Sequence, residues 1–261
     1  INSSSDLKKL FKKEKYGGLI HLAASKASGE SMVNPLKYAK NNIMGGMNLL
    51  SKSIKYGIKK FVFSSSAAVY GSPQYIPIDE KHQLEPSNYY GYTKLFIERN
   101  LEWFSKLKNF RFASLRYFNA AGYDSNSNIR GLEQNPHNLI PIIMEVASGK
   151  RNKMKIYGND YETRDGTGIR DYVHVSDLAK AHIDALGYLY NKRKNLTVNL
   201  GARRGYSVLE VIKKVEKITK VRIDFEIVAR RFGDSDEVIA DSSNAEKLIN
   251  WSPKYSDLGE I

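Results

Sequence analysis

The sequence contains no cysteine, and no apolar run in it approaches the roughly 20 residues of a membrane-spanning helix. The first absence excludes disulfide bonds and thiolate metal sites. The five histidines have no H-E-x-x-H or similar ligand spacing, so we expect no metal centre. Residues 1–16 lack the apolar stretch of a signal peptide. Together these absences predict a soluble, cytoplasmic protein that does not associate with membranes.

Acidic residues are too few to balance the basic ones, because 41 Lys and Arg stand against 28 Asp and Glu, a net charge of +13. Such a charge raises the hypothesis of a nucleic-acid binder. The lysines are scattered, however, and the 17 tyrosines are not interleaved with them in any repeating way. We therefore expect no nucleic-acid partner, and a basic chain also suits a small anionic substrate.

A serine cluster after an apolar run begins the pattern on which the functional interpretation depends. Residues 61–63 form a short aromatic and β-branched run typical of a buried strand, and serines follow it at 64–66. Ligands of open α/β sheets collect at the carboxyl ends of the strands. A helix that starts near Pro86 would carry Tyr90 and Lys94, four residues apart, on one face. The pair can therefore share a ligand.

The chemistry of this pair is that of a general base and its cation. A phenol has a pKa near ~10, so it is a poor base at neutral pH unless a nearby cation favours the phenolate. Lys94 supplies that cation, and the Ser66 hydroxyl can relay the proton of Tyr90. Tyr89 is a rival phenol, but it is turned away from the face of Lys94. A Y-x-x-x-K pair also occurs by chance as an ordinary exposed pair, so this spacing alone leaves both interpretations open.

Longer motifs connect the chain to a family. The stretch F-x-F-S-S-S-A-x-V-Y-G followed by Y-G-x-x-K resembles the extended short-chain dehydrogenase/reductase superfamily, and the triple serine before Ala67 resembles its UDP-glucose 4-epimerase branch. Four further matches stand in the family's order, namely H-L-A-A-S-K-A-S-G-E-S at 21–31, L-R-Y-F-N-A-A-G at 115–122, G-N-D-Y-x-T-x-D-G-T-G-I-R-D-Y-V-H-V-x-D-L-A at 158–179 and R-x-G-D at 231–234. Several matches in order are more specific than any single motif.

The resemblance implies an α/β fold, a Rossmann-like doubly wound parallel sheet with a smaller C-terminal α/β domain for the substrate. Residues 1–122 would form a partial NAD-binding domain with the catalytic serine, tyrosine and lysine. Residues 123–261 would form mainly the nucleotide-sugar-binding domain, with some segments returning to the first sheet. The family begins with a strand, a G-x-x-G-x-x-G turn and a helix, which bind a pyrophosphate. That motif is missing here, so we expect that the first βαβ portion and a short segment after Leu258 are absent.

Local patterns predict the main helices and strands. Helices are expected at 6–15, 35–56, 90–104, 138–148 and 175–190, and Ser207-x-x-Glu210 is a capping box that opens a helix to Thr219. Strands are expected at 17–24, 61–63, 110–116, 155–157, 196–200 and 222–228, and residues 123–136 are expected to form a loop.

The resemblance also implies roles for single residues. Ser66, Tyr90 and Lys94 would be the proton relay, the general base and the cation that tunes it. The residues implied to contact NAD are Leu22, Ala23, Ala24, Lys26, Asn41, Ser64, Tyr90, Lys94 and Tyr117. Those implied to contact the UDP-sugar are Lys26, Ser66, Tyr90, Asn119, Asn138, Leu139, Lys155, Tyr157, Arg170, Arg231, Asp234 and Val238. Arg170 and Arg231 would hold the pyrophosphate, because a guanidinium fork matches phosphate oxygens. Asp171 and His174 are interpreted as structural.

The implied activity is the NAD-dependent, reversible inversion of C4 in UDP-glucose and UDP-galactose. Tyr90 would take the proton of the 4-hydroxyl while hydride leaves C4 for NAD, and hydride would return to the other face of the 4-keto sugar. A homodimer through the helices at 35–56 and 90–104 is also implied. Val238 stands four residues after Asp234, where family members restricted to these two sugars carry a bulky tyrosine. The smaller valine predicts that UDP-GlcNAc and UDP-GalNAc are interconverted too.

Other functions stay open at this point. A nucleotide-sugar dehydratase would need an acidic pair after the serines, where Ala67 and Ala68 stand. A non-catalytic fragment would bind a nucleotide sugar or another subunit without NAD. A nucleic-acid binder would show a strongly salt-dependent affinity for DNA.

Overall fold

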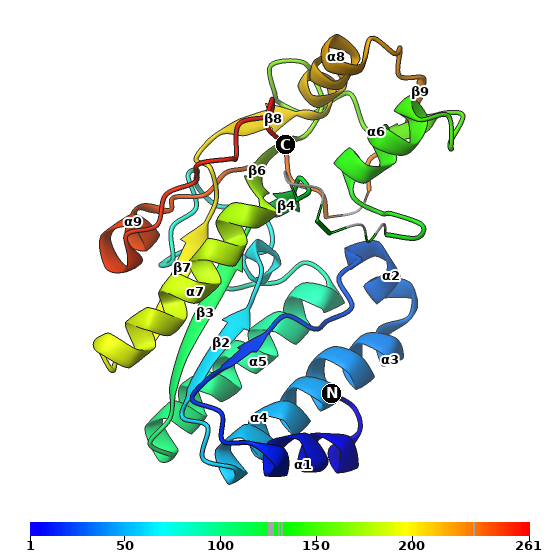
Figure 1. Ribbon diagram of the computed structural model, residues 1–261. Coiled ribbons are helices and arrows are strands. Elements are labelled where there is room, and N and C mark those ends of the chain that lie inside the picture. Colours follow the sequence, from blue (N-terminus) through cyan, green and yellow to red (C-terminus); the bar gives the residue numbers. More distant parts are fainter. Residues whose placement is uncertain (125–127, 130, 132, 232) are drawn as a thin grey trace.

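Four parallel strands form the sheet around which the chain is arranged (Figure 1). The structure is a computed structural model that describes residues 1–124, 128, 129, 131, 133–231 and 233–261, so part of the predicted loop at 123–136 lies outside the described residues. In pairing order the strands are β1 (Leu19–His21), β2 (Lys60–Ser64), β3 (Arg111–Tyr117) and β7 (Leu196–Leu200). All three junctions are parallel, which brings the carboxyl ends of the strands to one edge.

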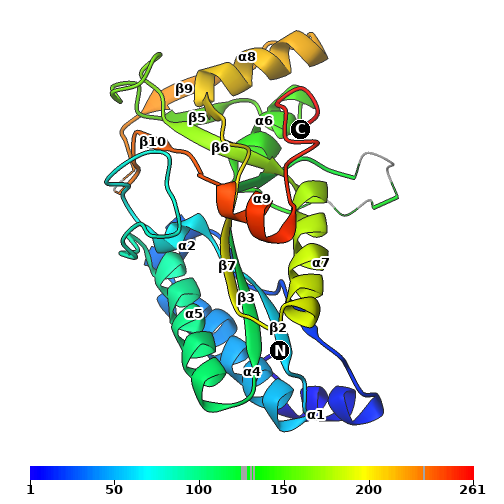
Figure 2. The ribbon, with the colours of Figure 1, turned by 90° about the vertical axis from the view of Figure 1, so that its left-hand side faces the viewer.

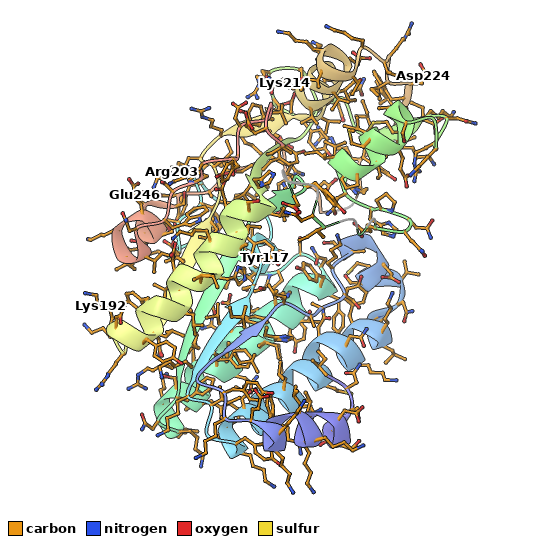
Figure 3. All side chains as sticks on the ribbon, in the orientation of Figure 1. Tyr117, Lys192, Arg203, Lys214, Asp224 and Glu246 are labelled. Atoms are coloured by element: carbon orange, nitrogen blue, oxygen red, sulfur yellow. The ribbon has the colours of Figure 1, made fainter. Side chains whose placement is uncertain are left out.

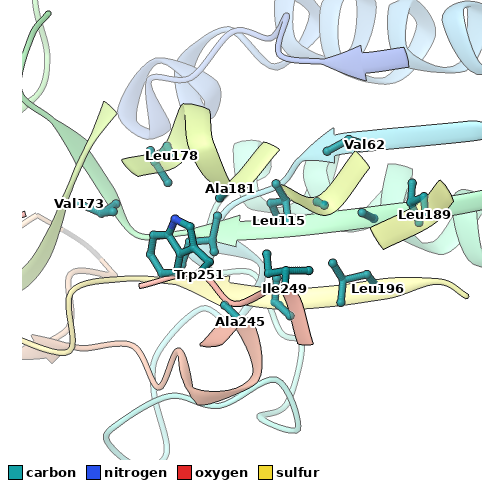
Figure 4. Close-up of a cluster of buried hydrophobic side chains, with 14 residues drawn as sticks. Val62, Leu115, Val173, Leu178, Ala181, Leu189, Leu196, Ala245, Ile249 and Trp251 are labelled. Carbon is teal, nitrogen blue, oxygen red and sulfur yellow. The ribbon is translucent and has the colours of Figure 1, made fainter. Parts of the chain in front are cut away.

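Helices cover both faces of this sheet (Figure 2). On one face, Phe61 and Phe63 pack under α1 (Ser4–Lys13), α4 (Gly45–Lys55) and α5 (Tyr89–Leu107). On the other face, Val62 and Leu115 pack under α7 (Val175–Asn191) and α9 (Ser243–Ile249), and Trp251 closes this cluster (Figure 4). Alternate residues of each strand are thus buried on opposite sides, as a parallel sheet with two helical layers requires. The predicted α/β, doubly wound arrangement is confirmed.

The helix predicted at 35–56 is not one regular helix. It begins as α3 (Pro35–Tyr38) with Pro35 in the first turn, continues as a π-helix (Ala39–Met44) and ends as α4. The sequence also suggested that Leu36 lies on or near the apolar side of this helix with Met47 and Leu50, but 80% of its surface is exposed. A π-helical turn holds one more residue than an α-helical turn, so it changes which residues face the sheet. A short helix, α2 (Ser28–Val33), precedes this run.

The C-terminal half builds a second body on the carboxyl edge of the sheet (Figure 2). Strand β6 (Ile169–His174) lies between β10 (Glu237–Val238) and β4 (Asn119–Ala121), and β8 (Gly205–Ser207) pairs antiparallel to it. A two-stranded sheet of β5 (Met154–Tyr157) and β9 (Phe225–Val228) packs with α6 (Leu139–Ala147) and α8 (Val208–Thr219). The predicted capping box at the start of α8 is confirmed, whereas the strand predicted at 222–228 begins only at Phe225.

Asp171, in β6 of this second body, ties three chain segments together. Its fully buried carboxylate accepts hydrogen bonds from the backbone N–H groups of Ala202 at 2.7 Å, Arg203 at 3.1 Å and Ala240 at 3.2 Å. Gly201 permits this approach, because a Cβ there would lie 2.6 Å from the carboxylate. The contacts agree with the structural interpretation of Asp171 made from the sequence.

Candidate active site

The carboxyl ends of β2 and β3 meet the first turn of α5 (Figure 1). The predicted catalytic residues belong to these three elements and the loop after β2. Ser64 ends β2 and is fully buried. Ser66 is half-buried, and its hydroxyl accepts a hydrogen bond from the backbone of Ala68 at the start of a short 3-10 helix (Ala67–Val69). Tyr117 ends β3 and lies inside the fold, whereas Lys192 lies at its edge (Figure 3).

The first turn of α5 is fixed by three local features. The Asn88 side chain accepts a hydrogen bond from the backbone of Gly91 at 2.9 Å, and the Ser31 hydroxyl accepts one from the backbone of Tyr90 at 3.0 Å. A Cβ at position 91 would collide with the carbonyl oxygen of Ala68, so only glycine lets the helix approach so closely. The Tyr-Gly pair of the sequence motif therefore brings Tyr90 directly against the serine loop.

Tyr90 and Lys94 face the same interior space. Tyr90 is 7% exposed and Lys94 is 4% exposed. The Lys94 Nζ atom lies 5.7 Å from the centre of the Tyr90 ring and donates a hydrogen bond to the backbone carbonyl of Ser64 at 2.7 Å. Tyr89 instead stacks on Tyr92, with ring centres 5.7 Å apart. The helical face predicted from the four-residue spacing is thus the observed one.

Burial dominates the protonation of both groups. It raises the pKa of Tyr90 far above its ordinary value, and the neighbouring Tyr117 raises it further, while a hydrogen bond from Ser66 opposes them. Burial lowers the pKa of Lys94 to about 8, opposed by the carboxylate of Glu98. The sequence led us to expect that Lys94 holds the pKa of Tyr90 down. In this structure desolvation outweighs that effect, because the ammonium points at the Ser64 carbonyl rather than at the phenol oxygen.

The loop after β1 lines the other side of this space. Leu22 is 64% exposed, and the side chains of Ala23, Ala24 and Lys26 are exposed as well. Ala23 and Ala24 line a narrow pocket whose other walls come from His21, Asn42, Phe63, Thr93, Lys94 and Ile97. Small side chains at this edge leave the backbone accessible to a ligand, as predicted for the cofactor side.

Asn42 is a site residue that the sequence interpretation missed. It is 3% exposed, accepts a hydrogen bond from the backbone N–H of Ser25 at 2.8 Å, and donates to the Ser25 carbonyl and the Thr93 hydroxyl at 3.0 Å each. The predicted residue, Asn41, donates to the Ser25 hydroxyl at 3.1 Å from a half-buried position. The Asn-Asn pair within the helix was the available signal. Because it lies in the π-helical segment, both side chains reach Ser25.

These residues fit the nicotinamide end of NAD. Among the described residues, the Lys94 ammonium has one hydrogen-bond acceptor, the Ser64 carbonyl, so two of its three donors stay available to ligand hydroxyls. A buried, incompletely paired ammonium costs free energy, which a hydroxyl-bearing ligand would offset. Tyr90 lies beside it on the same helix turn.

A second cluster, on the C-terminal body, brings together five residues predicted to bind the UDP-sugar. The Arg231 Nε atom donates to the Asp234 carboxylate at 2.9 Å, and the Arg231 guanidinium lies 4.4 Å from the centre of the Tyr157 ring. The Arg170 guanidinium lies 4.0 Å from the same carboxylate. Val238 stands beside Arg170 in the register of β10 and β6. The sequence did not single out Arg230, which pairs with Asp160 at 2.8 Å and covers the Tyr161 ring at the edge of this cluster.

The remaining predicted substrate contacts are spread over the C-terminal body and its border. Asn119 is exposed on β4, Asn138 is exposed just before α6, and Leu139 is half-buried as its first residue. Lys155 is exposed on β5. Lys26 forms an ion pair with Glu133 at 2.9 Å, which connects the loop after β1 to the segment leading into the C-terminal body.

Two classes of site are missing from the described part of the chain. No cluster of three or more His, Asp or Glu side chains there could hold a metal ion. None of its helices combines the length and the apolar character that crossing a membrane requires.

Comparison with known proteins identifies the relatives of this chain. Residues 1–257 match the family model described as GDP-mannose 4,6 dehydratase. The UDP-glucose 4-epimerase of Lacticaseibacillus casei is 43% identical over 256 residues, which are 98% of this chain and 77% of that protein.

Two solved structures carry the same fold. The UDP-glucose 4-epimerase of Bifidobacterium longum in complex with NAD+ and UDP has a TM-score of 0.93 and 38% identity, and the match covers 100% of this chain and 78% of that one. The UDP-Glc/GlcNAc 4-epimerase of Campylobacter jejuni has a TM-score of 0.84 and 41% identity, with 99% and 78% covered.

The buried ammonium of Lys94 leads to a prediction about stability. Replacing it in Lys94→Met should raise the free energy of unfolding at pH 7 by about 1–3 kcal/mol, because the folded state no longer holds a desolvated charge. The unfolded chain binds a proton more readily than the folded one between the two pKa values, about 8 and 10.5. The gain should therefore be complete below pH 8 and vanish near pH 10.5.

Urea denaturation across this pH range measures the effect. Lys106→Met, an exposed position on the same helix, is the control and should show no such gain. A Lys94→Met protein less stable than the parent at pH 7 would contradict the argument.

Proposed function

The chain belongs to the UDP-glucose 4-epimerase family of the extended short-chain dehydrogenases/reductases, and on this premise we propose that it interconverts UDP-glucose and UDP-galactose by NAD-dependent inversion at C4. The observation that carries the proposal is the arrangement of Ser66, Tyr90 and Lys94 at the carboxyl edge of a parallel sheet. The second body adds the cluster of Arg170, Arg231 and Asp234. The first group is suited to proton transfer. The second is suited to holding a diphosphate.

Tyr90 is the proposed general base for the 4-hydroxyl proton. It is almost completely buried and hydrogen-bonded to Ser66, which can pass the proton between the sugar and the phenol. The Ser64 carbonyl holds the Lys94 ammonium one helical turn away. The C4 hydroxyl is oxidised to a carbonyl, and the carbonyl is then reduced to a hydroxyl of the opposite configuration. The same residue can therefore accept and return the hydroxyl proton in both directions of the reaction.

Bound NAD would supply the acceptor for the C4 hydride and the hydride that reduces the 4-keto sugar from its other face. We assign its nicotinamide end to Lys94, Tyr90, Ser64 and Tyr117. We assign the loop residues Leu22, Ala23, Ala24 and Lys26, together with Asn41, to the rest of the contact. Asn42 supports them by joining Ser25 to Thr93.

The diphosphate is assigned to the two arginines, and the ribose to Asp234. Arg231 commits its Nε atom to Asp234, which leaves the Nη atoms of the guanidinium for phosphate oxygens. Tyr157 offers an exposed aromatic ring for the uracil, and Asn119, Asn138, Leu139, Lys155 and Lys26 complete the proposed nucleotide-sugar contacts. We also propose that residues 1–122 and 123–261 are the cofactor and substrate domains, with β7 and α7 returning to the first sheet.

Two alternative functions, a dehydratase and a non-catalytic binding protein, would require other properties of the site. A dehydratase needs an acid and a base that eliminate water from the sugar, and Ala67 and Ala68 carry no such group after Ser66. A fragment that binds nucleotide sugar without catalysis would purify without NAD and show no turnover.

The cytoplasmic location remains a prediction, which cell fractionation tests.

The small side chain of Val238 supports a wider sugar specificity. Val238 and Ala67, the residue directly after Ser66, both pack against a buried cluster that contains Phe118, the residue directly after Tyr117. A valine there occupies less volume than a tyrosine, so we propose that a 2-acetamido group fits beside it. The Campylobacter jejuni enzyme named for both glucose and N-acetylglucosamine substrates, similar to this chain, supports the same proposal.

The homodimer is proposed from an exposed apolar stripe on α5. Tyr92, Trp103 and Leu107 lie at helical spacing and are 48%, 61% and 66% exposed. Met44, at the end of the neighbouring π-helical segment, is 65% exposed. Exposed apolar side chains on adjacent helices are suited to pairing with the same surface of a second copy.

We expect Tyr90→Phe to reduce turnover at least about 100-fold in the NAD-loaded enzyme, because the substitution removes the proton acceptor. The affinity for UDP should stay within about twofold, since the diphosphate contacts are unchanged. Steady-state kinetics with UDP-galactose and calorimetry with UDP measure the two quantities. Tyr89→Phe is the matched control, and a larger loss there than at Tyr90 would contradict the assignment.

The pocket prediction is tested with two sugar pairs. The parent enzyme should epimerise both UDP-glucose and UDP-GlcNAc, and Val238→Tyr should abolish the second activity while sparing the first, because the ring fills the acetamido space. Turnover of UDP-glucose alone by the parent would show that another side chain closes the pocket.

The dimer prediction is tested in solution. Trp103→Glu should shift the protein from dimer to monomer in sedimentation velocity, because a carboxylate in an apolar interface lacks a partner. Ile183→Glu, at a 62% exposed position on the opposite helical layer, should leave the dimer intact. A parent protein that sediments as a monomer would exclude the proposed interface.

A further inference from the structure

The Val-Tyr-Gly end of the serine motif, residues 69–71, has no task in the reaction proposed above. Its tyrosine, Tyr70, is nevertheless among the largest fully buried side chains and is only 1% exposed. The Tyr70 hydroxyl accepts a hydrogen bond from the Arg116 Nη1 atom at 3.1 Å and donates one to the Asn199 Oδ1 atom at 2.6 Å. Arg116 of β3 and Asn199 of β7 stand opposite each other in the register of these strands. The hydroxyl therefore bridges two strands of the sheet.

The direction of both hydrogen bonds is fixed from the ends of the chain. A guanidinium can only donate, and the Ile78 carbonyl, which accepts from the Asn199 Nδ2 atom at 2.9 Å, can only accept. The amide of Asn199 thus turns its oxygen toward Tyr70. Burial raises the pKa of Tyr70 to about 12, so the phenol keeps its hydrogen at neutral pH. Without the hydroxyl, a guanidinium N–H and an amide oxygen would be buried without a partner.

The same chain of hydrogen bonds reaches the helix of the proposed base. Arg116 donates through Nε at 3.0 Å and through Nη2 at 2.6 Å to the carboxylate of Glu98. Glu98 belongs to α5 and stands one helical turn after Lys94. Buried side chains therefore join α5 to Tyr70 through the sheet.

Tyr70 is separated from Ser66 by one tight turn of backbone. The N–H of Val69 donates to the Ser66 carbonyl at 3.3 Å, and the N–H of Tyr70 donates to the Ala67 carbonyl at 3.0 Å. A turn this short transmits a displacement of one end to the other. Whatever holds Tyr70 therefore also restrains Ser66.

This turn touches α5 at a second point. The Ala68 carbonyl oxygen lies so close to Gly91 that a Cβ there would be 2.3 Å away. A contact of this kind sets the nearest approach of the turn to the helix, but it does not prevent the turn from moving away. The hydrogen bonds of the Tyr70 hydroxyl do prevent it, because through Arg116 they connect the turn to the same helix.

We propose that Tyr70 is a positioning residue whose hydroxyl, bonded to the sheet, fixes the place of Ser66 relative to Tyr90. The kinetic consequence rests on the proposed function, in which Ser66 relays the proton. The restraint on the turn is a property of the folded protein. Because a misplacement of about 1 Å can slow a reaction about 100-fold, a looser turn should lower kcat.

Hydrogen exchange is the first test, and it needs no activity. Tyr70→Phe should speed the exchange of the backbone N–H groups of residues 69 and 70 about tenfold or more, because the turn opens more often. Asn199→Ala, which removes the acceptor of the phenol, should speed the same two groups. The N–H of Val62, inside β2, should keep its rate in both variants. Unchanged exchange at residues 69 and 70 would overturn the proposal.

A double-mutant cycle in the NAD-loaded enzyme is the second test. Tyr70→Phe should lower kcat about tenfold, with KM for UDP-galactose within about twofold, because the diphosphate contacts are unchanged. In a Ser66→Ala background, which lacks the relay, the same substitution should change kcat less than about twofold. Losses that multiply in the double variant would overturn the proposal, because Tyr70 would then act independently of Ser66. A Ser66→Ala enzyme with the kcat of the parent would overturn it as well.

Leu101→Ala separates positioning from stability. Leu101 is fully buried on α5, in the apolar cluster that contains Phe61 and Phe63. Its truncation should lower the melting temperature while leaving kcat within about twofold at temperatures where the protein is folded. A fall in kcat that followed the melting temperature across all variants would contradict the positioning role. A parent without epimerase activity would count against the assigned function, and hydrogen exchange would still decide whether Tyr70 restrains the turn.

Discussion

The desolvated ammonium of Lys94 is the constraint on which the arrangement of this site depends. A charge buried this deeply needs a partner, and the partner is the backbone carbonyl at the end of β2, 2.7 Å away. That bond fixes α5 against the carboxyl edge of the sheet. The same helix turn carries Tyr90, and Gly91 lets it touch the serine loop. Removing water from the cation and the phenol therefore also determines how the helix sits on the sheet.

A set of uncharged side chains keeps this arrangement in place from the cofactor side. Asn42 joins Ser25 to Thr93, and the Thr93 hydroxyl donates to the Tyr90 carbonyl at 2.7 Å. Ser31 holds the backbone of Tyr90.

A buried ion pair lies further along the same helix. Arg116 and Glu98 form it at 2.6 Å, and both side chains are almost fully buried. Such a pair adds little net stability. A packing of α5 on β3 that separated the two side chains would leave a buried charge without a partner, so the pair disfavours such packings.

The sequence was sufficient for the features that depend on local spacing. The four-residue interval correctly placed Tyr90, and not Tyr89, on the helical face of Lys94, and the apolar runs predicted β2, β3 and β7 close to their observed bounds. Features that depend on contacts between residues distant in the chain could not be predicted from the sequence. Asn42 and His182 are ordinary polar residues in their helices, and their partners, Thr93 and Ser64, lie 51 and 118 residues away in the chain. The π-helix was missed because one extra residue per turn leaves the apolar pattern of a helix almost unchanged.

The two sides of the proposed site differ in burial and in charge pairing. On the side of the proposed base, Tyr90 and Lys94 are almost completely buried. On the substrate side, more than half of the Arg231 side chain is exposed, and Asp234 orients it through Nε. A carboxylate so close to a phosphate ligand repels it, but it also holds the guanidinium fork and reduces the entropy lost on binding. Under the proposed assignment, burial positions the groups for proton transfer, whereas diphosphate binding would depend on the competition between Asp234 and phosphate oxygens for the arginines.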